Sequence, residues 1–90
     1  MTDRSATEAA MAIIRVHLTF PEESVKRPVI YEIGQEFDVV TNIRRANVTA
    51  TSGWVVLEIS GERDEIERAI EGFKSRGVRV DPVEGDVVSP

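Results

Sequence analysis

The sequence has no cysteine, a single histidine and few aromatic residues, the last amounting to 6% of the chain. Without cysteine there can be no disulfide bond, no thiolate zinc site and no cysteine-ligated iron–sulfur cluster. A chain of 90 residues buries only about 60 to 65% of the surface that its unfolded form exposes, so its core is marginal alone. We therefore expect a homodimer, because self-association would supply the missing stability.

Basic residues are outnumbered by acidic ones, 11 against 16, which gives a formal net charge of -5. Nucleic-acid binding relies on clustered Lys and Arg that neutralise phosphates, so we expect no nucleic-acid partner. No apolar run approaches the length of a membrane span, and residues 1–12 lack the apolar region of a secretory signal. These absences favour a cytoplasmic protein with no direct membrane insertion.

Hydrophobic periodicity predicts an α+β fold with the element order β-α-β-β-α-β. Alternating apolar residues favour strands, and apolar residues at helical spacing favour helices, the first of which has Ser24 as its predicted cap. Thr51, Ser52 and Gly53 supply turn chemistry for a hairpin between the second and third strands. The expected strands are 13–20, 39–49, 54–60 and 78–83, and the expected helices are 22–36 and 62–76.

This order is typical of the ferredoxin-like fold, a four-stranded antiparallel sheet with two helices on one face. We expect residues 1–12 to be a flexible N-terminal segment, 13–83 to form the domain and 84–90 to be a C-terminal tail. The other sheet face would be open. It is expected to carry Arg15, His17, Thr19, Trp54, Val56 and Glu58. Because Trp is enriched at interface hot spots, we interpret Trp54, with His17 and Val56, as an interface.

Catalytic and metal-binding groups are few. His17 is the only histidine and alternates onto the polar face of a strand, which is more typical of a surface residue than of a general base. The acidic residues Glu22, Glu23, Glu62, Asp64 and Glu65 lie at predicted helix N-termini, where the helix dipole favours solvated carboxylates. We expect no enzyme, no metal and no cofactor.

Asn42 lies within an apolar, strand-like run, although amides are depleted in strands. Two explanations remain open, a local backbone hydrogen bond and a ligand contact. Arg44 and Arg45 follow, and adjacent strand residues point to opposite faces, so they cannot hold one anion together unless a bulge intervenes. A bulge is conceivable, because Ile43 and Ala46 can share the buried face only if the register shifts between them.

The sequence resembles a known family. The ordered set that carries the resemblance is Leu18-Thr19-Phe20-Pro21, Pro28-Val29-Ile30, Phe37-Asp38-Val39, Asn42-Ile43, Gly53, Val55-Val56-Leu57-Glu58, Gly61 and Gly77-Val78. It is similar to the NIL domain, named for an Asn-Ile-Leu motif. The resemblance implies a ferredoxin-like fold and a regulatory role. NIL domains occur in ATP-binding subunits of methionine ABC importers, where they pair and bind methionine to inhibit transport.

The motif asparagine of the family maps onto Asn42 and the second motif position onto Ile43, while Arg44 replaces the leucine. The resemblance therefore implies ligand-binding roles for Asn42 and Ile43, and the carboxylate of an amino acid could bind Arg44. The leading hypothesis is a dimeric regulatory module that senses methionine or a related sulfur amino acid.

A second branch of the family, fused to a ferredoxin module and linked to homocysteine synthesis, resembles the chain still more closely. It shares Phe20-Pro21, Pro28-Val29-Ile30-Tyr31 and Arg45-Ala46. The alternative hypothesis is therefore a non-catalytic interaction subunit that binds an enzyme or ferredoxin of homocysteine and methionine metabolism through its open face.

Overall fold

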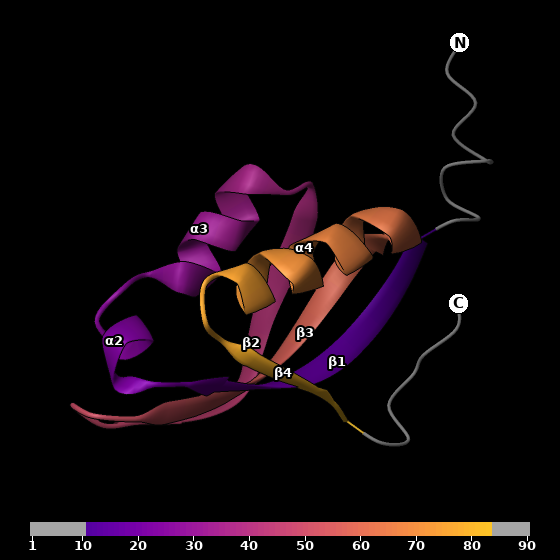
Figure 1. The fold of residues 1–90 in the computed structure, drawn as a ribbon. Coiled ribbons are helices and arrows are strands. Elements are labelled where there is room, and N and C mark those ends of the chain that lie inside the picture. The colour runs from indigo at the N-terminus through magenta and orange to yellow at the C-terminus, as the bar shows by residue number, and fades with distance from the viewer. Residues whose placement is uncertain (1–10, 84–90) are drawn as a thin grey trace, which may run out of the picture.

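The computed structural model describes residues 11–83, which form one antiparallel sheet with helices on a single face (Figure 1). The strand order is β2-β3-β1-β4, the arrangement of a ferredoxin-like fold. The elements are β1 (Met11–Phe20), α2 (Glu22–Val25), α3 (Val29–Glu36), β2 (Val39–Val48), β3 (Gly53–Glu62), α4 (Arg63–Ser75) and β4 (Arg79–Pro82). The predicted fold class is confirmed, and β2 and β3 form the predicted hairpin.

The helix predicted over 22–36 is two helices, α2 and α3, and the single-helix prediction is wrong in this respect. Pro28 is the N-cap residue of α3. Proline has no N–H to continue the preceding helix, and it disfavours helical backbone at the residue before it. The prediction that Ser24 caps the first helix is also wrong. Ser24 lies inside α2, whose N-cap residue is Pro21, and the Ser24 hydroxyl donates to the Arg76 carbonyl at 3.2 Å.

The first strand begins two residues earlier than the sequence indicates. Met11 and Ala12 belong to β1, and Ala12 is buried opposite Gly61 of β3. The remaining predictions for the N-terminal segment and the C-terminal tail fall on residues 1–10 and 84–90, which lie outside the described residues.

The core lies between the sheet and the helices. Along β3, Val55, Leu57 and Ile59 are buried, whereas the residues between them are not, as period-2 alternation predicts. From α4, Ile66, Ala69 and Phe73 are fully buried against them. Burial of a side chain as large as Phe73 contributes roughly 1.5 to 3 kcal/mol. The helices therefore fix which sheet face is left open.

Helix α4 ends at Ser75, one residue before the predicted end, and its C-cap residue Arg76 is followed by Gly77. This glycine has a φ of 83°, and its N–H donates to the Lys74 carbonyl at 3.0 Å. The N–H of Val78 donates to the Phe73 carbonyl at 3.1 Å, which completes a Schellman motif. The turn directs β4 back along β1, where Val80 pairs with Leu18.

A bulge in β2 determines which of its side chains face the helices. Ile43 pairs with Leu57, the next paired residue is Arg45 opposite Val56, and Arg44 is left without a partner in the register. The extra residue returns Ala46 to the side of Ile43, opposite Val55. The register shift that the sequence makes conceivable is therefore present.

Candidate functional site

Asn42 lies on the open face of the sheet, in a row of three strands. It pairs with Glu58 of β3, which in turn pairs with Arg15 of β1. The Arg15 Nη2 donates to the Glu58 Oε2 at 3.0 Å, so these two charges offset each other. Asn42 is exposed, and its side chain forms no hydrogen bond with any residue in 11–83. The amide has both its donor and its acceptor available.

Ile43 lies on the opposite face from Asn42. Its register partner is Leu57, which is fully buried beneath the helices. The Ile43 side chain is nevertheless 54% exposed, because it lies in the half of β2 that extends beyond the core. The sequence groups Asn42, Ile43 and Arg44 into one ligand site, but the structure places Asn42 and Ile43 on opposite faces of the sheet.

Arg44 and Arg45 lie in a hollow of the open face. The hollow has a volume of about 290 Å³ and is lined by Arg15, Arg44, Arg45, Val56 and Val83. In a regular strand the two adjacent arginines would point to opposite faces. The bulge brings both of them to the side of Val56, two register positions from the pair of Asn42 and Glu58.

The three expected interface residues also share the open face. His17 pairs with Val56, and the His17 imidazole stacks on the Trp54 indole with ring centroids 5.4 Å apart and an interplanar angle of 18°. Both residues are half-buried. The open face therefore has an aromatic end at Trp54 and a charged end at the arginines, with Val56 between them.

A second hollow lies on the helix side of the sheet, between the β2–β3 hairpin and the helices α2 and α3. Its volume is about 220 Å³, and its lining is mostly apolar. The residues that line it include Phe20, Val25, Pro28, Tyr31, Ile43 and Val48. Apart from the Tyr31 hydroxyl, its polar side chains have partners within the fold, Ser24 at the Arg76 carbonyl and Arg27 at Glu32.

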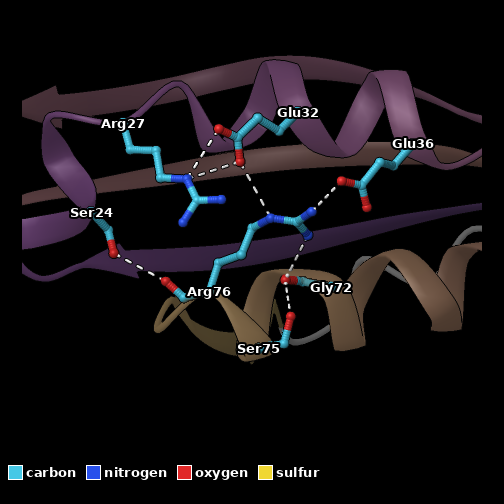
Figure 2. Close-up of polar contacts among 7 residues, drawn as sticks. All are labelled: Ser24, Arg27, Glu32, Glu36, Gly72, Ser75 and Arg76. Atoms are coloured by element: carbon cyan, nitrogen blue, oxygen red, sulfur yellow. Dashed lines mark hydrogen bonds and ion pairs between the residues drawn. The ribbon is translucent and has the colours of Figure 1, made fainter.

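Arg76 holds the helices that form one wall of this second hollow (Figure 2). Its Nε lies 3.3 Å from the Glu32 Oε1, its Nη2 donates to Glu36, and its Nη1 donates to the Gly72 carbonyl at 3.1 Å. Arg27 donates through Nε to both Glu32 oxygens, at 3.1 and 3.0 Å. This hydrogen bond, with the negative charge of Glu32, raises the pKa of Arg27 above its ordinary value.

The arrangement offers recognition groups for a polar ligand. On the open face a free amide, two unpaired guanidinium groups and an apolar floor lie within neighbouring register positions. Within 11–83 no group of three or more His, Asp or Glu residues could hold a metal ion. In the same part of the chain, no helix is both long enough and apolar enough to cross a membrane.

Sequence reasoning left Arg45 out of the ligand site and gave Arg76 only the role of a basic residue in the last turn of a helix, and the structure gives each a defined position. For Arg45 the signal was present, because the bulge that turns it toward Arg44 follows from the apolar pattern of β2. Arg76 gave no comparable signal. A basic residue in the last helical turn is typical of the macrodipole alone, and its partners Glu32 and Glu36 lie 44 and 40 residues away in the sequence.

Comparisons with known proteins identify the family. The model of the NIL domain matches residues 14–82. The methionine import ATP-binding protein MetN 3 of Bacillus cereus is 33% identical over 72 residues, which cover 76% of this chain and 21% of that protein. MetN 2 of Bacillus thuringiensis subsp. konkukian gives the same values. The chain thus spans about a fifth of the length of these relatives.

A solved structure agrees with the sequence relatives. The crystal structure of the C-terminal domain of an ABC transporter ATP-binding protein from Enterococcus faecalis is 28% identical, with a TM-score of 0.70. The similarity covers 81% of this chain and 86% of that domain. On the match of the family model, supported by these relatives and by the shared fold, the chain belongs to the NIL domain family.

Proposed function

We propose that the chain is a regulatory ligand-binding module that senses methionine or a related sulfur amino acid as a dimer. The observation that carries the proposal is the position of Asn42, which maps onto the motif asparagine of its family and presents an unpartnered amide on the open face. The names of the relatives, methionine import ATP-binding proteins, favour methionine as the ligand class. A cytoplasmic location fits a domain related to ATP-binding subunits.

The open face suits an amino acid better than the helix-side hollow does. A zwitterion needs partners for its carboxylate and its ammonium group, because unpaired charges are costly to bury. The open face supplies Arg44 for the carboxylate and the Asn42 amide oxygen for the ammonium group, and neither side chain has a partner in 11–83. Ser24 and Arg27 in the helix-side hollow already have partners. We therefore assign the ligand contacts to Asn42 and Arg44 and assign Ile43 to the other face.

The exposed apolar surface supports dimerisation through β2. This strand is at the edge of the sheet, and an edge strand presents unpaired backbone groups to a second chain. Val40, Ile43 and Val48 are among the six exposed large hydrophobic residues in 11–83, and all three lie on β2. A second copy along this edge would cover them.

Neither role requires catalysis, and we assign the chain no reaction. The imidazole of His17 stacks on Trp54. Asp81, which lies opposite His17 on β4, pairs with Arg79 at 3.0 Å.

A second candidate function is an interaction subunit that docks a partner of sulfur metabolism on the open face. The stacked rings of His17 and Trp54 favour it, because half-buried aromatic groups are typical binding anchors.

Calorimetric titration of the purified chain with L-methionine, L-homocysteine and S-adenosylmethionine tests the proposal. Saturable heat with at least one of them is the expected result, and no heat with any of them at millimolar concentration would contradict it. Light scattering on material purified from its native host separates the two functions. A sensor is expected as a homodimer, whereas an interaction subunit would carry a stoichiometric second protein.

A further inference from the structure

The bulge in β2 places two positive charges side by side. Arg44 has no register partner, and Arg45 lies opposite Val56. Both residues line the hollow of about 290 Å³ on the open face, together with Arg15, Val56 and Val83. A strand without the bulge would have pointed one of them toward the helices.

The charges of this pair are not offset within the described chain. Arg44 and Arg45 are exposed, and neither side chain forms an ion pair or a hydrogen bond with a residue of 11–83. Glu58, a carboxylate on the same face, pairs with Arg15 at 3.0 Å. Two like charges held together repel each other, and an anion between them would remove that repulsion. The chain has a net charge of -5, so this pair is a local concentration of positive charge in an acidic protein.

We propose that the bulge makes Arg44 and Arg45 a single carboxylate-binding site, which selects ligands with a free α-carboxylate. This inference rests on the function proposed above. Guanidinium groups bind carboxylates through charge-assisted hydrogen bonds, which are about twice as strong as neutral ones. With the carboxylate held there, Asn42 lies two residues before Arg44 on β2, and Val56 supplies an apolar floor. Arg45 becomes a ligand-binding residue, and amino-acid esters bind more weakly than the free amino acids.

Titration of L-methionine and of L-methionine methyl ester into the wild-type chain and three variants tests the inference. Arg44→Gln and Arg45→Gln each remove one charge from the hollow. Arg79→Gln removes the same charge from β4, on the same face but outside the hollow. We expect both hollow variants, and the ester on the wild type, to bind at least about tenfold more weakly, and Arg79→Gln to bind as the wild type does.

A second readout separates failure of the inference from failure of the proposed function. Sodium acetate, compared with sodium chloride at equal ionic strength, is titrated while the backbone amide resonances of Arg45 and Val56 are followed by NMR. We expect saturable shifts that are absent in Arg45→Gln.

Each outcome bears on one of the two proposals. Methionine that binds both hollow variants with wild-type affinity would overturn the carboxylate site and leave the sensor function standing. If no amino acid binds but acetate still gives saturable shifts, the carboxylate site stands and the sensor function fails. If acetate gives no shift, the site is overturned.

Discussion

Asn42 and Ile43 are adjacent in the sequence and lie on opposite faces of the sheet. Asn42 is opposite Glu58 on the open face, and Ile43 is opposite Leu57 on the helix side. A pair of motif residues that looks like one site is therefore divided between two surfaces. The amide is available to a ligand, and the isoleucine belongs to the apolar edge formed by β2.

We expect Ile43→Ala to change association and not ligand binding. The side chain is 54% exposed, so its truncation should cost less than the roughly 2 to 5 kcal/mol of a buried Ile→Ala change. Light scattering over a range of protein concentrations should show a dimer that dissociates more readily, while calorimetry with L-methionine gives wild-type affinity. A loss of methionine affinity with an unchanged dimer would show that Ile43 contacts the ligand.

The glycines of α3 and α4 should respond in opposite directions to alanine. A Cβ at Gly34 would meet nothing within 4 Å, so Gly34→Ala should raise the free energy of unfolding by up to about 1 kcal/mol through helix propensity. A Cβ at Gly72 would lie 2.8 Å from the Phe37 Cε2 and 2.9 Å from the Ile33 Cδ1, so Gly72→Ala should lower it by roughly 1 to 3 kcal/mol. Urea denaturation measures both, and equal effects would contradict the packing of α3 on α4.

Arg76 and Arg27 both contact Glu32, and only Arg76 should matter for stability. The Arg76 side chain is 13% exposed and also binds Glu36 and the Gly72 carbonyl (Figure 2). Arg76→Gln should lower the free energy of unfolding by roughly 1 to 3 kcal/mol, because it leaves Glu36 without its donor and removes one of two partners from both Glu32 and the Gly72 carbonyl. Arg27 is exposed, and Arg27→Gln should leave the denaturation midpoint unchanged. Equal midpoints for the two variants would contradict this difference.

The single tryptophan should report ligand binding. Trp54 lies on β3 two residues from Val56, which forms the floor of the arginine hollow. Binding on the open face should therefore change the intensity or the wavelength of its emission as L-methionine is added. In Arg45→Gln the same change should require at least about tenfold more L-methionine. A calorimetric isotherm without any change in emission would favour a ligand on the helix side.

The sequence predicts the sheet well because alternation along β1 and β3 is regular and each strand has one buried face. It predicts the first helical segment less well. The apolar stripe from Val25 to Ile33 is continuous, but the missing N–H of Pro28 divides it, and periodicity does not register a missing hydrogen bond. The start of β1 at Met11 depends on pairing with Glu62, a contact between residues far apart in the sequence.

The candidate site shows the same division. The sequence indicates that Asn42 is unusual and that a bulge would change the direction of the arginines. Which face each side chain takes depends on the pairing of β2 with β3, because a shift of one residue moves every later side chain to the other face. The ion pairs of Arg76 with Glu32 and Glu36 of α3 depend on packing between segments about 40 residues apart, which no local pattern records.

The most direct test of the account compares Asn42→Ala with the wild type in two measurements on the same material, thermal unfolding and calorimetric titration with L-methionine. Since the exposed Asn42 side chain has no partner within 11–83, we expect the unfolding temperature to be unchanged and the affinity to fall at least about tenfold. A variant that unfolds at a clearly lower temperature, or that binds methionine as the wild type does, would show that Asn42 is not the ligand contact proposed here.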